Sequence, residues 1–158
     1  MARYNDHLTY EAVMDMNYLE MIINEALRKY PPVVSLTRGV RVLIPVYGIH
    51  HDPDYYPEPE KFDPDRFSSE NKRTRPAFSF LPFGDGPRVC IGARFGMMQA
   101  KLGLISILLN YKFSVNVKTQ EPLQYHTQSF TLSTKGGMWL NFEKITEEKT
   151  VICNGEVK

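Results

Sequence analysis

The chain has 158 residues, of which 42% are hydrophobic and 12% aromatic, and this length suffices for one globular domain. A net charge of only +1 argues against a nucleic-acid-binding protein. Two cysteines, Cys90 and Cys153, supply no disulfide framework, and we expect neither a signal peptide near Met1 nor a membrane-spanning segment.

Two helices are predicted at the start of the chain. Thr9 is a suitable N-cap for a short helical turn, and Asp15 for a longer helix over residues 16–30, which a proline pair ends. Glu25 and Arg28 are three residues apart and lie on one side of this helix, away from its apolar stripe. Their spacing alone indicates a surface ion pair worth a few tenths of a kcal/mol.

The middle of the chain predicts a strand and then a long loop. Residues 39–47 are apolar and β-branched, so they favour a strand that has Pro45 at its end or edge. The adjacent His50 and His51 point in different directions, which favours loop or cap histidines over a shared metal site. Residues 52–75 are rich in proline and charge, but aromatic anchors indicate a packed loop. These anchors are Tyr55, Tyr56, Phe62 and Phe67.

The most informative stretch is residues 83–92, which contain three glycines, a proline, an arginine and a cysteine directly before an apolar helix pattern. Cys90 is expected near the free N–H groups that begin this helix, which favour thiolate over thiol. With Arg88 two residues away, the thiolate suits a soft metal centre that carries anionic groups, such as haem. A small buried cysteine and a phosphate-binding loop stay open as alternatives, although the glycines do not fit the dinucleotide pattern.

After this loop the pattern changes from helix to strand. Residues 93–110 are apolar on nearly all faces and predict a buried helix, in which Met97 and Met98 fill the core rather than bind metal. Alternation over residues 111–117 predicts a strand, and residues 129–142 predict a hairpin that turns at two glycines. The charged tail after about residue 145 is expected to be frayed.

Three segments together resemble one family. The string Phe-x-x-Gly-x-Arg-x-Cys-x-Gly at residues 83–92 resembles the haem-binding signature of the cytochrome P-450 family, the haem-thiolate monooxygenases. Glu25-x-x-Arg28 resembles the helix K motif of that family. Residues 62–67 resemble its Pro-x-Arg-Phe segment, so Arg66 would complete a structural triad with Glu25 and Arg28. The likeness runs from about residue 9 to residue 145 and is greatest to insect microsomal members of the detoxifying kind.

The resemblance implies a fold and a set of site residues. The fold would be mainly α with small β elements, a partial domain over residues 1–158 that comprises helix K, the meander, the cysteine loop, helix L and a C-terminal β hairpin. Cys90 would be the catalytic residue and the axial thiolate ligand of haem iron, with Arg88 on a propionate and Phe83 on the sulfur side of the haem. The remaining cofactor-binding residues would be Gly86 and Gly92, and the substrate-contact candidates are Val33, Val34, Phe130 and Leu132.

The implied reaction inserts one atom of O2 into a lipophilic organic substrate and reduces the other atom to water, with electrons from NADPH delivered by a reductase partner. Family members of this kind lie on the cytoplasmic side of the endoplasmic reticulum membrane, held by an anchor, and we expect that anchor to be absent from this sequence. Against the family pattern we expect only the C-terminal third, without the oxygen-activating helix, and an internal gap after Arg38. Exposed apolar patches should result. The alternatives are an inactive haem-binding or partner-binding fragment, and a structural α+β domain with Cys90 in its core.

Overall fold

The computed structural model describes residues 9–33, 36–38, 42–126, 129 and 131–145. Helices form most of the regular structure, and four short strands make two separate two-stranded antiparallel sheets. The predicted class, mainly α with small β elements, is confirmed. In chain order the elements are α1 (Tyr10–Met14), α2 (Asn17–Lys29), β1 (Leu36–Arg38), β2 (Val42–Ile44), α3 (Val46–His50), the 3-10 turn η1 (Pro64–Phe67), α4 (Ser69–Thr74), the 3-10 turn η2 (Gly86–Arg88), α5 (Ala93–Leu108), β3 (Tyr111–Val115) and β4 (Leu140–Lys144).

The first two helices begin and end through local hydrogen bonds. The Thr9 hydroxyl accepts the Ala12 N–H at 3.2 Å, which confirms Thr9 as the N-cap of α1. The prediction that Asp15 caps α2 is wrong. Asp15 keeps right-handed helical torsions and closes α1, and its N–H donates to the carbonyl of Glu11. The chain therefore leaves the helix one residue later, at Met16, which makes no side-chain cap.

The predicted strand over residues 39–47 is shorter than expected. Within the described residues it covers Val42–Ile44, which pairs with β1 so that Leu36 lies opposite Ile44. Pro45 ends the strand, and residues 46–50 turn into α3 instead of extending it. The long loop that follows is packed through Tyr56 and Phe67, whereas the other two expected anchors, Tyr55 and Phe62, are each 44% exposed. It also contains η1 and α4, which the sequence pattern did not predict.

The predicted C-terminal hairpin pairs differently from the expectation. Gly136 and Gly137 do supply a turn, with φ values of 78° and 77°. The returning segment nevertheless pairs with the distant β3, where Val115 lies opposite Leu140. Aromatic contacts across the two strands hold this pairing, with the ring centroids of Phe113 and Phe142 6.2 Å apart. Residues before the turn are bridged elsewhere, Tyr125 to Thr134 and Val33 to Thr131.

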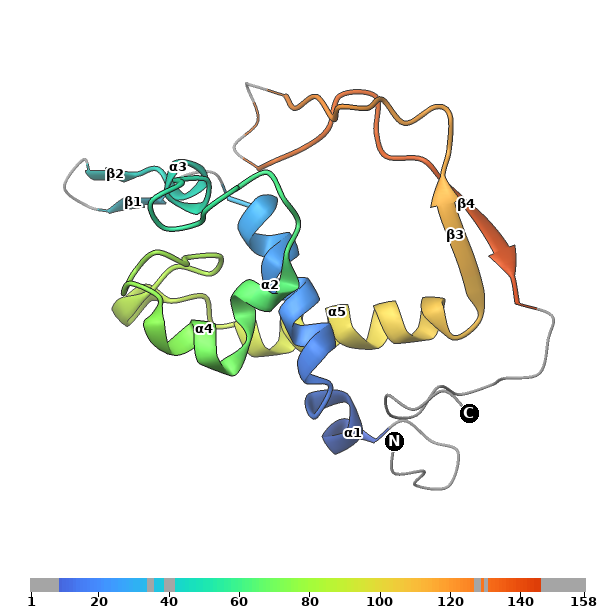
Figure 1. Cartoon of the computed structure of the whole chain (residues 1–158), viewed down its shortest axis with the longest axis horizontal. Helices are drawn as coiled ribbons and strands as arrows, with labels where there is room; N and C mark the ends of the chain where they lie inside the picture. Colours follow the sequence, from blue (N-terminus) through green and yellow to red (C-terminus); the bar gives the residue numbers. More distant parts are fainter. Residues whose placement is uncertain (1–8, 34–35, 39–41, 127–128, 130, 146–158) are drawn as a thin grey trace.

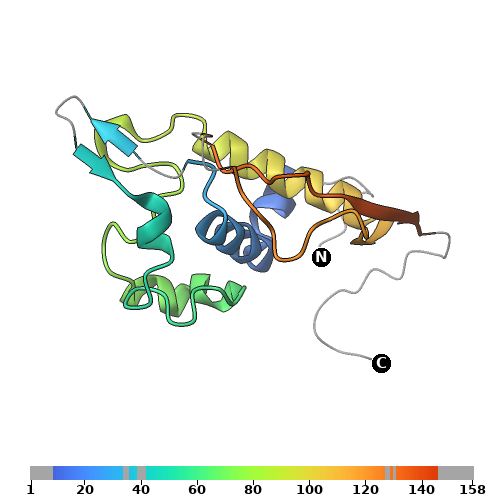
Figure 2. The same ribbon diagram turned by 90° about the horizontal axis from the view of Figure 1, so that it is seen from above.

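The core lies where α2 and α3 meet residues 52–82. The buried hydrophobic side chains there are Ile23, Val46, Tyr56, Phe67 and Leu81. Figure 1 shows α5 passing behind α2 and leading into β3, while residues 116–126 and 131–139 lie on the side of the C-terminal end of α2. Figure 2 shows α5 and the β3–β4 sheet extending in one direction away from this core.

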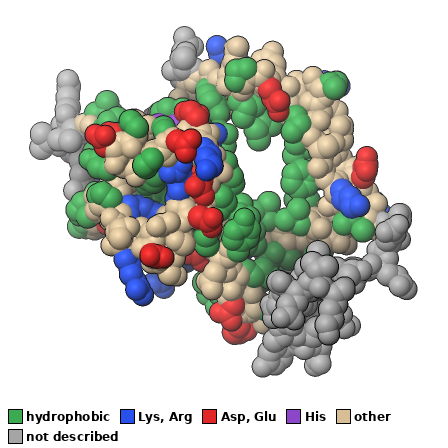
Figure 3. Space-filling view, in the orientation of Figure 1, with side chains coloured by type: hydrophobic (Ala, Val, Ile, Leu, Met, Phe, Trp, Pro, Cys, Tyr) green, Lys and Arg blue, Asp and Glu red, His purple; other side chains and the backbone are tan. Residues whose placement is uncertain are grey.

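Helix α5 is exposed, so the prediction of a buried helix is wrong for this chain. Only Lys101 and Ile105 are buried along it, whereas Phe95 is 59% exposed and Leu102 is 45% exposed. Figure 3 shows hydrophobic side chains around an open gap framed by α2, α5 and the β3–β4 sheet. This agrees with the expectation of exposed apolar patches, because nothing among the described residues covers those faces.

Of the helices in the described part of the chain, none has the length and apolar character needed to cross a bilayer.

Candidate functional site

Glu25 and Arg28 form a fully buried ion pair, not the surface pair that their spacing indicated. Both side chains are 0% exposed. The guanidinium binds the carboxylate with two hydrogen bonds, from Nε to Oε2 and from Nη2 to Oε1, each 2.8 Å long. The residue spacing gave the right side of α2, but it could not show that residues 50–63 fold back over that side.

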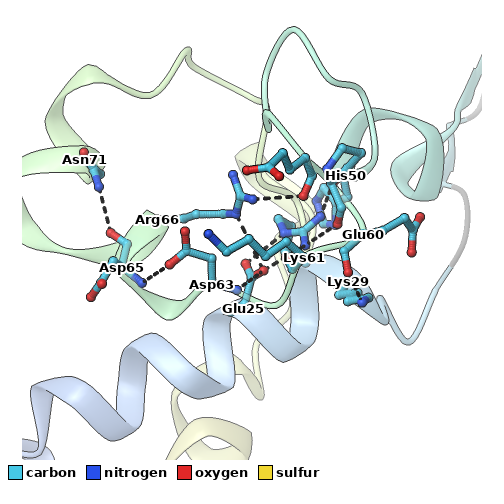
Figure 4. Close-up of polar contacts among 12 residues, drawn as sticks. Glu25, Lys29, His50, Glu60, Lys61, Asp63, Asp65, Arg66 and Asn71 are labelled. Carbon is cyan, nitrogen blue, oxygen red and sulfur yellow. Dashed lines mark hydrogen bonds and ion pairs between the residues drawn. The ribbon is translucent and has the colours of Figure 1, made fainter.

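Arg66 approaches the same carboxylate, so the structure brings the three members of the expected triad together. Its Nε lies 3.7 Å from Glu25 Oε1, a distance that suits an ion pair but is too long for a hydrogen bond (Figure 4). Its Nη2 donates to the carbonyl of Glu58 at 3.1 Å. The Asp63 N–H donates to Glu25 Oε1 at 3.0 Å. One carboxylate thus fixes η1 and the loop before it onto α2.

The Arg28 side chain also binds backbone carbonyls of α3 and of the loop that follows it. It donates from Nη1 to the carbonyl of His50 and from Nη2 to the carbonyl of Pro59, each at 2.8 Å. The Tyr56 ring lies under the guanidinium, 5.2 Å from ring centroid to Cζ. The pair therefore acts as a framework that joins α2, α3 and the loop over residues 52–63.

His50 is a functional candidate that the sequence pattern missed. It is fully buried, and its Nε2 accepts the Leu81 N–H at 2.9 Å. Burial is the main cause that lowers the pKa of His50 to about 4. The available signal was the spacing to Val46, because residues four apart on a helix share a face and Val46 is buried as well. His51, in contrast, stacks on Tyr47 at the edge of the core.

The cysteine loop is a tight turn closed by backbone hydrogen bonds. The Cys90 N–H donates to the carbonyl of Phe83 at 2.9 Å, and the Cys90 carbonyl accepts the Ala93 N–H at 3.2 Å. Gly84 and Gly86 have φ values of 74° and 77°, which other residues rarely adopt. Cys90 is exposed, which contradicts the alternative of a cysteine buried in the core.

The surroundings of Cys90 fit a haem. Haem iron accepts a cysteine sulfur, so Cys90 would hold the cofactor through its iron. The apolar neighbours Val89 and Ile91 are 50% and 104% exposed, so they offer a surface that a flat apolar ring can cover. A Cβ on Gly92 would sit 3.9 Å from the sulfur, so the missing side chain keeps one approach to it open. Arg88 is exposed at the end of η2, where a carboxylate can reach it.

A cavity of about 500 Å³ lies beside this loop, between α1, α2 and α5. Phe83, Met97 and Met98 line it, so the two methionines face a cavity rather than fill a core. Lys101 closes one side, with its Nζ 3.0 Å from Glu20 Oε2. Burial alone would raise the pKa of Glu20, but the hydrogen bond and the positive charge of Lys101, with Lys72 beside it, bring it below its usual value.

The substrate-contact candidates are described only in part. Val33 is bridged to Thr131, and the Leu132 N–H donates to the carbonyl of Pro32 at 3.2 Å, so Val33 and Leu132 lie close together near the end of α2. Val34 and Phe130 lie outside the described residues. A second apolar cavity, of about 440 Å³, adjoins Leu132.

Replacing Gly86 by alanine is expected to destabilise the chain by about 1–2 kcal/mol, because a Cβ at positive φ clashes with the following carbonyl. Gly92→Ala is the matched control. Gly92 has a φ of −87° and its Cβ would meet only an ordinary contact, so we expect a change within about 0.5 kcal/mol. Urea unfolding followed by circular dichroism measures both variants, and equal losses would contradict the prediction.

Comparison with known proteins identifies what this chain is similar to. The family model described as Cytochrome P-450 matches residues 2–141. Probable cytochrome P-450 6a23 of Drosophila melanogaster is 44% identical over 164 residues, which cover 93% of this chain and 33% of that protein. Cytochrome P-450 9e2 and cytochrome P-450 6j1 of Blattella germanica are 43% and 44% identical, and cover 89% and 91% of this chain and 30% and 32% of their own length. The chain therefore spans about a third of the length of these relatives.

Proposed function

Because this chain belongs to the cytochrome P-450 family, whose members are haem monooxygenases, we propose that it carries the haem-ligand portion of an enzyme that inserts oxygen into a lipophilic substrate. The observation that carries the proposal is the exposed Cys90 thiol on a glycine-rich turn, flanked by exposed apolar side chains. When bound, haem supplies the iron centre at which O2 is activated. Electrons would come from NADPH through a reductase partner.

The residues of the loop have separate roles in this proposal. Cys90 provides the sulfur ligand, and the hydrogen bond from its N–H to the Phe83 carbonyl fixes where that sulfur lies. Phe83 limits the access of water to the sulfur. Arg88 binds a carboxylate of the cofactor, and the bare backbone at Gly86 and Gly92 allows close approach.

The remaining assignments extend the proposal beyond the loop. Val33 and Leu132, with Val34 and Phe130 outside the described residues, are the side chains proposed to contact substrate. The microsomal membrane of the endoplasmic reticulum, on its cytoplasmic side, is the proposed location of the whole enzyme.

A second candidate is haem or partner binding without turnover. The open apolar gap beside α5 favours it, because a haem held on one side only stays accessible to water. Product formation with an added reductase separates this candidate from the monooxygenase.

Adding haem to the purified chain and reducing it under carbon monoxide tests the proposal. We expect the Soret band of a thiolate-ligated complex, and we expect Cys90→Ser to abolish it, because a hydroxyl is a poor ligand for this iron. Gly92→Ala, which should leave stability unchanged, should weaken haem uptake. A Cys90→Ser variant that keeps the parent spectrum would overturn the assignment of the ligand.

A further inference from the structure

Two buried side chains hold the segment that leads into the cysteine loop. His50 Nε2 accepts the N–H of Leu81 at 2.9 Å, and the Tyr56 hydroxyl donates to the carbonyl of Ser79 at 2.9 Å. Between these two hydrogen bonds, the Phe80 ring stacks on the imidazole with centroids 5.5 Å apart. Residues 79–81 are therefore fixed on both sides by groups from α3 and from the loop after it.

The fixed segment is connected to Cys90 by a short stretch of chain and one backbone hydrogen bond. Leu81 is two residues before Phe83, and the Phe83 carbonyl accepts the Cys90 N–H at 2.9 Å. At its other end, the carbonyl of His50 accepts a hydrogen bond from Arg28 Nη1 at 2.8 Å. His50 thus connects the buried ion pair on α2, through its carbonyl, with the segment that leads into the cysteine loop, through its imidazole.

We propose that His50 is a positioning residue for the Cys90 loop, and that its neutral imidazole sets where the Cys90 backbone lies by accepting the Leu81 N–H. The role of this position in holding a haem ligand rests on the proposed function. The hydrogen-bond role itself does not, since it concerns only residues of this chain.

The chemistry of the site requires a neutral ring. An Nε2 that accepts a hydrogen bond carries no proton, so the single proton of the imidazole lies on Nδ1. Among the described residues Nδ1 has no hydrogen-bond partner. A substitution that removes the ring nitrogens therefore removes the unpaired N–H donor at Nδ1. It also leaves the Leu81 N–H without its acceptor. Global stability should change little, and loop geometry is the better measurement.

Three variants and two measurements test the proposal. His50→Phe keeps an aromatic ring against Phe80 but removes the acceptor, His50→Gln restores an acceptor near the position of Nε2, and His51→Phe is the matched control at the neighbouring histidine. The first measurement is amide hydrogen exchange of the haem-free chain. In His50→Phe we expect the Leu81 and Cys90 amides to exchange about tenfold faster, while Leu109 at the far end of α5 stays unchanged.

The second measurement is the carbon monoxide spectrum of the reduced, haem-loaded chain. His50→Phe should lower the fraction of the thiolate-type Soret band, whereas His50→Gln and His51→Phe should keep it. If His50→Phe does not fold, His50→Asn replaces it, because its shorter side chain cannot reach the Leu81 N–H.

The outcomes separate this inference from the proposed function. Parent-like exchange at Leu81 and Cys90 in the variant without an acceptor overturns the positioning role, and so does a His50→Gln variant that is as impaired as His50→Phe. A parent chain that never gives the thiolate band overturns the proposed function, while the exchange data still decide the role of His50.

Discussion

Glu25→Gln is expected to lower the free energy of unfolding by about 3–5 kcal/mol, because it leaves the Arg28 guanidinium buried without a negative partner. Both side chains are 0% exposed, so water cannot replace the lost charge. The second guanidinium, Arg66, 3.7 Å from the same carboxylate, adds to the loss. Single domains are stable by only about 5–15 kcal/mol, so this one substitution should remove a large part of the free energy of unfolding.

The exposed ion pair between Lys72 and Glu20 provides the control. Its nitrogen and oxygen are 3.5 Å apart, and the two side chains are 43% and 34% exposed. Lys72→Gln should therefore cost less than about 1 kcal/mol. Urea titrations of the three proteins by circular dichroism measure both losses. The buried framework would lose its proposed importance if Glu25→Gln cost no more than Lys72→Gln.

Acidification from pH 6.5 to pH 4.5 should destabilise the parent by about 2–3 kcal/mol more than it destabilises His50→Gln. Burial lowers the pKa of His50 from 6.5 in the unfolded chain to about 4 in the folded one, and the positive charges of Arg28 and His51 add to this. Between these values the unfolded state binds the proton and the folded state does not. Stability is therefore complete above pH 6.5 and falls as the pH drops toward 4.

The difference between the parent and His50→Gln reports the titration of His50, because both proteins contain the same carboxylates. Glu20, whose pKa is lowered from its usual 4.5, keeps its stabilising charge above that pH and loses it as the pH falls further. Unfolding free energies at pH 7, 5.5 and 4.5 for the parent and His50→Gln give the difference directly. Parallel curves for the two proteins would show that His50 is not the group that titrates.

Local chemistry predicted much of the fold. The Thr9 hydroxyl could be identified as a cap because it needs only a backbone N–H three residues later. The Cys90 loop could be identified because fixed spacings of glycine, arginine and cysteine are specific. Both depend on neighbours in the chain.

Features that depend on distant parts of the chain were not predictable in this way. The burial of Glu25 and His50 is produced by residues up to 38 positions away, through contacts such as that of Asp63 with Glu25. The pairing of β4 with β3 places Asn141 opposite Ser114, which lies 27 residues earlier in the chain. An apolar helix such as α5 is expected to pack against other elements, but its composition does not show whether those elements are present. The exposure of α5 is therefore not predictable from its own residues.

The partners of Arg28 have an order along the chain that matters for biosynthesis. Among the described residues, every group that the side chains of the Glu25–Arg28–Arg66 triad bind by a hydrogen bond or ion pair lies within residues 25–66, ahead of Cys90. Translation proceeds from the N-terminus, so a ribosome has polymerised the whole ionic framework before it adds the cysteine. The residues of the framework therefore emerge from the ribosome ahead of the cysteine loop.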